Sequence, residues 1–283
     1  MKLLLSLIPF VVGYSPDISN HTLVLSIAEL SSNAYYNYTQ RETWRNTTKI
    51  WTYIDSFGWD NDDGLKVHIF AHTQERVISI VTKGTTLMSL QDKESDNLMF
   101  GCDYNPDKLN DSLPELYITL LLNIYHNLTV KFPLYSFVFV GHSLASSLSS
   151  LAAMKTCNSA VSFSGPGEML FANRIHYQHD CGNQHKYTIH HIGYEFDPIF
   201  TGTCGLVCSV FGYNMQSKCH HGLIHTLKNN GKDDGIGIYS PDTQNGLYIY
   251  YHTTTYLIDH VLKRTTFIPE GIPETNCTEI CEE

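Results

Sequence analysis

Residues 137–153, FVFVGHSLASSLSSLAA, pass from an apolar β-favouring run through a Gly-His-Ser turn into small residues that suit a helix. An apolar run bounded by a turn is typical of a strand buried on both faces in a parallel sheet. A serine at the tip of such a strand-turn-helix junction is how one large class of hydrolases presents its nucleophile. A serine can equally be a turn residue, so the rest of the chain must supply a base, an orienting acid and an oxyanion site.

Runs with strand character alternate with runs with helix character along the chain. Residues 66–72 and 76–82 are β-rich and separated by three residues, which predicts a hairpin. Further strands are expected at 135–140, 159–164, 186–193 and 246–251, and further helices after Ser143, at 167–175 and at 252–264. This alternation predicts an α/β-hydrolase fold with a mostly parallel central sheet flanked by helices, in which ligands bind at the carboxyl ends of the strands.

Residues 111–130 are expected to form an amphipathic helix of this fold. Ser112 and Glu115 stand three apart at its start and suit a capping box. The apolar side chains that recur at helical spacing are those of Leu113, Leu116, Tyr117, Leu120, Leu121, Ile124 and Leu128.

The first 15 residues have the pattern of a secretory signal peptide. A lysine precedes an apolar run from Leu3 to Val12, and cleavage is expected after Gly13 or Ser15. The run is shorter than the roughly 20 residues that cross a bilayer. A short uncleaved signal-anchor and a buried first strand or helix are the alternatives. Residues 16–283 contain no repeat and no low-complexity linker, so a single domain is expected there.

Two further features favour the secretory pathway. The sequence contains eight cysteines, an even number that indicates disulfides in a secreted chain. Cys204, Cys208 and Cys219, followed by two histidines, match no regular zinc spacing, so bridges are expected there in place of a metal site. Asn-x-Ser/Thr sequons, which suit a glycoprotein of the secretory route, occur at Asn20, Asn37, Asn46, Asn110, Asn127 and Asn276.

The charge of the chain excludes one class of partner. Its formal net charge is −10, and no basic patch stands out, which argues against a nucleic-acid partner.

The segment Gly141–Ala145 is close to the Gly-x-Ser-x-Gly nucleophile elbow. The tight turn requires small side chains two residues either side of Ser143. Gly141 meets this requirement, whereas Ala145 adds a methyl group that is tolerated only if its backbone φ stays negative. The small residues that follow suit close packing of the helix.

Ser143 needs a base and an acid that follow it in the chain, in the order Ser, then Asp or Glu, then His. Asp197 directly follows an apolar strand and is the preferred acid, with Glu195 as its rival. His252 stands between the runs 246–251 and 252–264 and is the preferred base, and His260 lies further along the same helix.

The oxyanion site requires backbone N–H donors. One is expected from Leu144, the residue after the nucleophile. The second should lie in a loop after an early strand, and Lys83, Gly84 and Thr85 occupy such a loop. Thr85 would offer both its N–H and its hydroxyl group.

Several segments together resemble the class 3 lipases, and within them the fungal vacuolar lipases that break down autophagic bodies. They span residues 80–86, 95–105, 141–153, 190–222 and 250–262, in the same order as in that family. The segment 190–222, with its Asp-Pro-Ile, Gly-Thr-Cys and Lys-Cys-His elements, is the most specific. The resemblance covers about residues 65–265.

The resemblance implies Ser143 as nucleophile, His252 as base oriented by Asp197, and Thr85 with Leu144 as oxyanion donors. It implies hydrolysis of membrane phospholipids or acylglycerols at a membrane surface without a cofactor or metal, in a vacuole or lysosome-like lumen or outside the cell. Ala145 and Ser146 depart from the paired glycines of the family. The rival hypotheses are a secreted small-ester or feruloyl-type esterase and a catalytically impaired glycoprotein that uses the scaffold as an interaction module.

Overall fold

Seven strands form one sheet, in which their spatial order is their order along the chain. The strands are β1 Thr52–Phe57, β2 Val67–His72, β3 Val77–Thr82, β4 Ser136–His142, β5 Ser159–Phe163, β6 Ile189–Tyr194 and β7 Leu223–Leu227. The pairs β1–β2 and β2–β3 are antiparallel, and every pair from β3 to β7 is parallel. The sheet confirms the predicted fold class and the predicted hairpin.

The computed structural model describes residues 13–47, 49–60, 63–86, 89–101, 113–177, 181, 187–204, 208, 219–228 and 247–275. The apolar run Leu3–Val12, the sequons at Asn110 and Asn276, Ser112 of the predicted capping box and the side chain of its Glu115 lie outside what is described. Within the described ranges, none of the helices combines the length and the apolar character that crossing a membrane requires.

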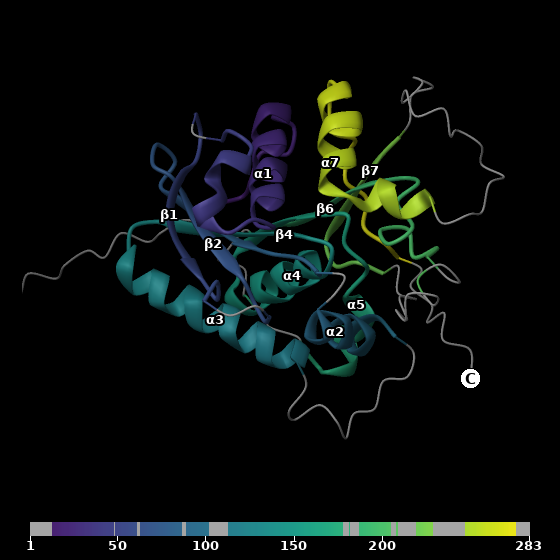
Figure 1. The fold of residues 1–283 in the computed structure, drawn as a ribbon, viewed down its shortest axis with the longest axis horizontal. Coiled ribbons are helices and arrows are strands. Elements are labelled where there is room, and N and C mark those ends of the chain that lie inside the picture. Colours follow the sequence, from purple (N-terminus) through teal and green to yellow (C-terminus); the bar gives the residue numbers. More distant parts are fainter. Residues whose placement is uncertain are drawn as a thin grey trace, which may run out of the picture.

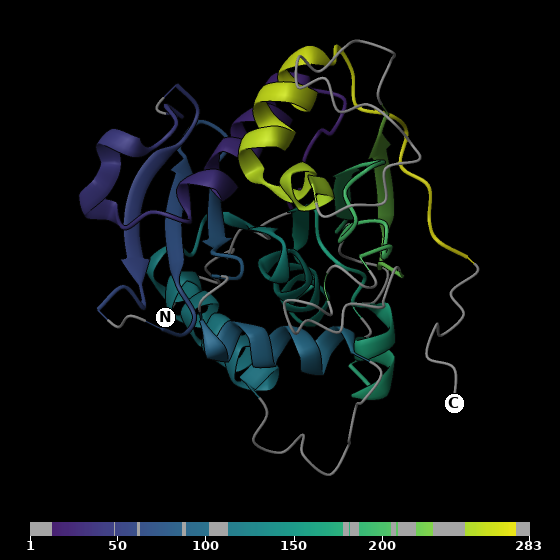
Figure 2. The same cartoon turned by 45° about the vertical axis from the view of Figure 1, so that its right-hand side comes forward.

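Helices cover both faces of the sheet (Figure 1). One face carries α2 Leu90–Phe100, α3 Leu113–Lys131, α4 Leu144–Thr156 and α5 Met169–Arg174. The other face carries α1 His21–Asn33 and a C-terminal helical segment that contains α7 Thr254–Tyr256, η4 Leu257–Val261 and η5 Leu262–Arg264. Figure 2 shows this yellow C-terminal segment beside the purple α1, and the two elements are in contact.

Strand β4 is apolar from Phe137 to Val140, where both of its faces are covered. Phe137 and Phe139 belong to the core beneath α3 and α4, whereas Val138 and Val140 belong to the core beneath α1 and the C-terminal helices. Side chains alternate between the two faces of a strand, so a strand with two buried faces needs an uninterrupted apolar run. This burial holds the carboxyl end of β4 at a defined place in the sheet.

Helix α4 packs directly against the sheet. Its residues from Leu144 to Met154 are all buried, including four serines. Two of these hydroxyl groups are satisfied, since Ser147 donates to the Pro166 carbonyl and Ser150 donates to Glu168. The small side chains therefore serve the close packing that the sequence predicts for this helix.

The predicted strand at 246–251 is wrong. The structure has the 3-10 helix η3 Leu247–His252 there. Aromatic residues favour strands only where they pack on a pleated surface. Here Tyr251 is buried in a helical turn, with its ring 5.7 Å from that of Tyr194 and 4.7 Å from that of Tyr256.

The predicted apolar face of the helix at 111–130 is partly wrong. Helix α3 forms over Leu113–Lys131, and Tyr117 and Leu121 are buried as expected. Leu116 and Leu120, however, are 49% and 40% exposed, whereas Ile118 is buried. The apolar stripe is wider than the strip that contacts the sheet, and the tertiary contact selects which part of it is covered.

Candidate active site

Ser143 lies at the junction where β4 ends and α4 begins. Its backbone has φ 61° and ψ −132°, a conformation that non-glycine residues adopt only at some cost in energy. A Cβ on Gly141 would lie 2.1 Å from the Ala145 carbonyl oxygen, so only glycine allows the strand and helix to approach this closely. Ala145 does not have a positive φ, which meets the condition for its extra methyl group.

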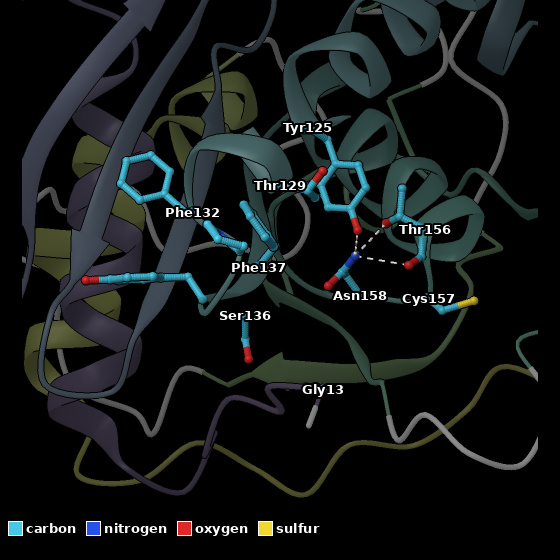
Figure 3. Close-up of a pocket in the computed structure, with 11 residues that line it drawn as sticks. Gly13, Tyr125, Thr129, Phe132, Ser136, Phe137, Thr156, Cys157 and Asn158 are labelled. Atoms are coloured by element: carbon cyan, nitrogen blue, oxygen red, sulfur yellow. Dashed lines mark hydrogen bonds between the residues drawn. The ribbon is translucent and has the colours of Figure 1, made fainter. Parts of the chain in front are cut away.

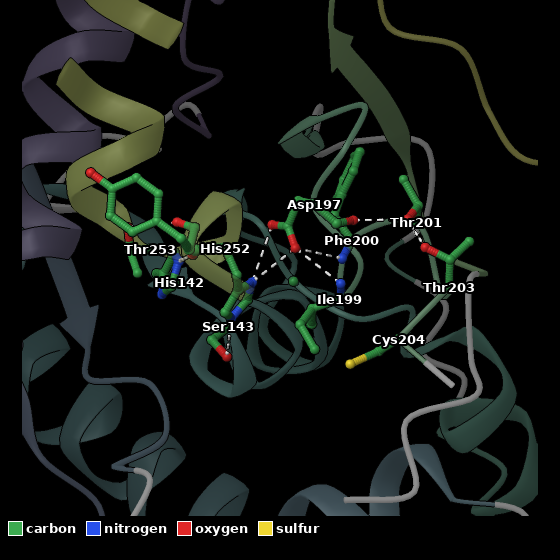
Figure 4. A network of polar contacts seen from close by, with 12 residues as sticks. His142, Ser143, Asp197, Ile199, Phe200, Thr201, Thr203, Cys204, His252 and Thr253 are labelled. Carbon is green, nitrogen blue, oxygen red and sulfur yellow. Dashed lines mark hydrogen bonds and ion pairs between the residues drawn. The ribbon is translucent and has the colours of Figure 1, made fainter. Parts of the chain in front are cut away.

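The structure brings three predicted residues together at the carboxyl edge of the sheet (Figure 4). The Ser143 Oγ lies 2.9 Å from the His252 Nε2. The His252 Nδ1 lies 3.1 Å from both carboxylate oxygens of Asp197. Serine hydroxyl, imidazole and carboxylate thus form a continuous hydrogen-bonded relay.

Asp197 is held in place by its own turn. The backbone N–H groups of Ile199 and Phe200 donate to its Oδ1 over 2.9 and 3.3 Å. Burial alone would raise the pKa of this carboxyl group, but the neighbouring His252 ring and the hydrogen bonds hold the pKa below its ordinary value. The side chain is therefore ionised and able to accept the Nδ1–H of His252.

The rival acid and base lie elsewhere. Asp197, not Glu195, faces the His252 ring. His260 stacks on Tyr256, with ring centroids 5.2 Å apart, on the C-terminal helical segment. His252 itself is the last residue of η3, so a helical turn, and not the end of a strand, presents it to Ser143.

The loop after β3 lies against the nucleophile. A Cβ on Gly84 would be 3.2 Å from the Cβ of Ser143 and 2.3 Å from the His142 carbonyl oxygen. Thr85, the next residue, donates its hydroxyl group to Asp96 over 2.7 Å. The N–H of Leu144, the first residue of α4, belongs to the free amide groups at a helix start. Gly84, the residue before Thr85, thus lies against Ser143, and Leu144 follows Ser143 directly in the chain, whereas the Thr85 hydroxyl group, which was predicted to face the oxyanion site, is bonded to Asp96.

Helix α2 holds this loop through hydrogen bonds, a contact that sequence reasoning missed. Asp92 accepts from the Thr86 N–H over 2.8 Å, and Asp96 accepts from Thr85. Burial raises the pKa of Asp96 to about 8. The signal was two acidic residues four positions apart in residues 90–100, a spacing that places them on one helix face.

Two disulfides are formed in the described part of the chain, as the even number of cysteines predicts. They join Cys157 to Cys181 and Cys204 to Cys208. Among the described residues, no group of three or more His, Cys, Asp or Glu side chains could hold a metal ion.

A cavity lies at the opposite edge of the sheet and does not form part of this site (Figure 3). Its volume is about 290 Å³, and its wall includes Ser136 at the start of β4 and Asn158 before β5. Tyr125 closes one side, and its phenol oxygen accepts a hydrogen bond from Asn158.

No family model matches the chain. The chain is 33% identical over 245 residues to a Candida glabrata protein named "Putative lipase ATG15". The aligned region covers 73% of this chain and 48% of the relative. It is 32% identical over 248 residues to the protein of the same name from Saccharomyces cerevisiae, covering 74% and 48%. This chain is a homologue of these lipases.

The homology confirms the lipase resemblance drawn from the sequence. The lipase homologue spans about half the length of these curated relatives. Solved structures with a similar backbone include a Rhizopus microsporus var. chinensis lipase, which is 15% identical in sequence. The match covers 76% of both chains and has a TM-score of 0.47. A Penicillium expansum triacylglycerol lipase matches at 15% identity, 76% of this chain, 82% of the other and a TM-score of 0.44.

Proposed function

We propose that this lipase homologue is a serine hydrolase that cleaves carboxylic ester bonds of membrane phospholipids or acylglycerols. The observation that carries the proposal is the relay from the Ser143 Oγ through His252 to Asp197, with separations of 2.9 and 3.1 Å. The name of its relatives supports the lipase class.

In the proposed reaction, the Ser143 oxygen attacks the ester carbonyl carbon while His252 Nε2 accepts the serine proton. The negative charge that develops on the carbonyl oxygen is stabilised by the backbone N–H groups of Leu144 and Thr85. The C–O bond then breaks, and the leaving alcohol takes the proton from His252. Water repeats the sequence on the acyl-serine and releases the fatty acid.

Asp197 has two functions in this scheme. It accepts the Nδ1–H of His252, which leaves the Nε2 lone pair free to take the serine proton. Its negative charge also stabilises the imidazolium that forms when Ser143 loses its proton. Each backbone oxyanion donor should lower the barrier by about 2.7–4 kcal/mol, the range known for such groups.

We further propose that the protein works in the lumen of a vacuole or lysosome-like compartment, or outside the cell, on membranes delivered there. The sequons, the disulfides and the N-terminal apolar run support this compartment. The Tyr14 carbonyl accepts a hydrogen bond from Ser159, and Ser15 contacts Thr188 over 3.0 Å. Cleavage after Gly13 would preserve both contacts, whereas cleavage after Ser15 would remove them.

The experiment that tests the function labels the purified protein with a fluorophosphonate and identifies the modified residue by mass spectrometry. We expect label on Ser143, and none on the Ser143→Ala variant. Hydrolysis of liposomal phospholipid, emulsified triacylglycerol and a soluble short-chain ester should then be compared on the same preparation. Label at another residue, or full activity in Ser143→Ala, would contradict the proposal.

The same triad would also serve a small-ester or feruloyl-type esterase. Preference for the soluble ester over both lipid substrates would favour that alternative. The catalytically impaired glycoprotein is motivated by one sequence feature, that Ala145 and Ser146 stand where the lipase family that the sequence resembles has paired glycines. Absence of labelling in a correctly folded protein would support it.

A further inference from the structure

The residue before the nucleophile makes an unusual pair of contacts. His142 is 4% exposed, and both of its ring nitrogens are engaged. Its Nδ1 lies 2.7 Å from the Tyr35 hydroxyl oxygen, and its Nε2 lies 2.7 Å from the backbone carbonyl oxygen of His252. The rings of His142 and His252 are 4.8 Å apart (Figure 4 shows His142 beside the relay).

The chemistry of these partners determines where the His142 proton lies. A carbonyl oxygen can only accept, so the Nε2 of His142 carries the hydrogen. Burial, together with the neighbouring His252, lowers the pKa of His142 to about 3, so the ring is neutral. The Nδ1 of a neutral ring with hydrogen on Nε2 is an acceptor, and the Tyr35 hydroxyl group donates to it.

Tyr35 also touches the loop that carries Thr85. A Cβ on Gly84 would lie only 2.2 Å from the Tyr35 hydroxyl oxygen and 2.3 Å from the His142 carbonyl oxygen. Tyr35 follows the C-terminal end of α1, where its N–H donates to Ser32. One phenol group therefore joins α1, the loop before Thr85 and the residue before the nucleophile.

We propose that Tyr35 and His142 are positioning residues for the base, an inference that rests on the proposed function. The Nε2–H of His142 holds the His252 carbonyl, and this fixes the backbone from which the His252 imidazole reaches Ser143. Tyr35 holds His142 in the tautomer that makes this bond. Without the Tyr35 hydroxyl group, the His142 proton is free to move to Nδ1, and the Nε2 lone pair would then face the carbonyl oxygen.

The test compares Tyr35→Phe, His142→Leu and His142→Gln with the unchanged protein. The glutamine amide can donate to the His252 carbonyl and accept from Tyr35, whereas leucine can do neither. Tyr125→Phe is the matched control, because it removes a phenol hydrogen bond at the opposite edge of the sheet. The readouts are kcat per fluorophosphonate-labelled site, KM and the melting temperature.

We expect kcat per labelled site to fall about tenfold in Tyr35→Phe and up to about a hundredfold in His142→Leu, with KM unchanged, as for a misplaced catalytic group. His142→Gln should recover most of the loss. Tyr125→Phe should lower the melting temperature without changing kcat. If His142→Leu does not fold, Tyr35→Phe and His142→Gln decide the question.

Values of kcat per labelled site within about twofold of the unchanged protein in Tyr35→Phe would overturn the inference. So would a loss in His142→Gln as large as that in Tyr35→Phe. Either result leaves the proposed function intact. Failure of the proposed function would instead appear as a lack of labelling and hydrolysis in the unchanged protein.

Discussion

The His252 Nε2 lies 2.9 Å from the Ser143 Oγ, although 109 residues separate them in the chain. Ser143 stands at the carboxyl end of β4, and the turn after β6 brings Asp197 to the same edge of the sheet. His252, the base, is the last residue of η3 and therefore lies on an element outside the sheet. The three groups thus depend on three separately positioned elements, which makes each of them testable by itself.

Asp197→Asn should leave the fold intact and lower kcat by about 10⁴-fold. The asparagine amide can donate to His252 Nδ1, which favours the tautomer with hydrogen on Nε2, and that tautomer cannot accept the serine proton. Steady-state kinetics on a soluble ester, with circular dichroism as a check on folding, measures the effect. Glu195→Gln is the matched control, since Glu195 lies two residues earlier and should leave kcat within about twofold. Equal losses of kcat in Asp197→Asn and Glu195→Gln would show that Asp197 is not the residue that orients His252.

His252→Ala should abolish turnover and fluorophosphonate labelling of Ser143, because the serine hydroxyl group loses its proton acceptor. His260→Ala should retain both, since its ring stacks on Tyr256 on the C-terminal segment. Labelling rates measured in parallel separate the two histidines. Normal labelling of His252→Ala would show that another base activates Ser143.

Asp96 should make the protein less stable as the pH rises from about 4 to 8. Its pKa is raised from 3.8 to about 8 by burial, so in this interval the folded protein keeps a proton that the unfolded chain releases. The contribution of Asp96 to the free energy of unfolding should therefore be highest at the acid end of this interval. Urea unfolding at several pH values, compared with Asp96→Asn, isolates the contribution.

Between pH 5 and pH 8 the free energy of unfolding of the unchanged protein should fall, relative to that of Asp96→Asn, by at least about 1.4 kcal/mol, the value of one pKa unit. The variant should show the flatter profile because its amide does not titrate. Parallel profiles would mean that Asp96 is ionised in the folded protein throughout this range.

Gly165→Ala should destabilise the protein by about 1–3 kcal/mol, because its new methyl group would overpack the site. The added Cβ would lie 1.9 Å from the Ser146 Oγ and 2.3 Å from the Ser146 Cβ, so rotation of the hydroxyl group cannot relieve the contact. Combining it with Ser146→Gly should restore most of the loss, and a double-mutant cycle in denaturant measures the coupling. Additive effects would show that the two positions do not meet.

The site residues differ in how far local sequence could locate them. Ser143 was predictable because Gly141 and the small residues after it mark the elbow by themselves. Asp197 and His252 were predicted from their positions after apolar runs and from the family resemblance. Tyr35 and Asp96 were missed as contributors to the site, because a lone tyrosine and an acidic residue on a helix carry no local sign of their partners.

The errors in the predicted fold also arise because local sequence does not reveal the tertiary partners of a segment. Residues 246–251 have the composition of a strand, yet Tyr251 packs in a helical turn against Tyr194 and Tyr256. Leu116 and Leu120 continue an apolar stripe but remain largely exposed. β-propensity and helical periodicity describe the secondary structure and the buried face that a segment can adopt. Tertiary contacts decide which secondary structure forms and which side chains are buried.

The sequence by itself determined the alternation of strands and helices, the position of the serine turn and the lipase resemblance, because these depend on local steric preference and on residue spacing. Only the tertiary structure decided which side chains meet: Tyr35 with His142, Thr85 with Asp96, and the backbone carbonyl of His252 with His142. Such contacts depend on angstrom-scale packing between elements that are distant in the chain, and the spacing of residues along a sequence does not encode that geometry directly.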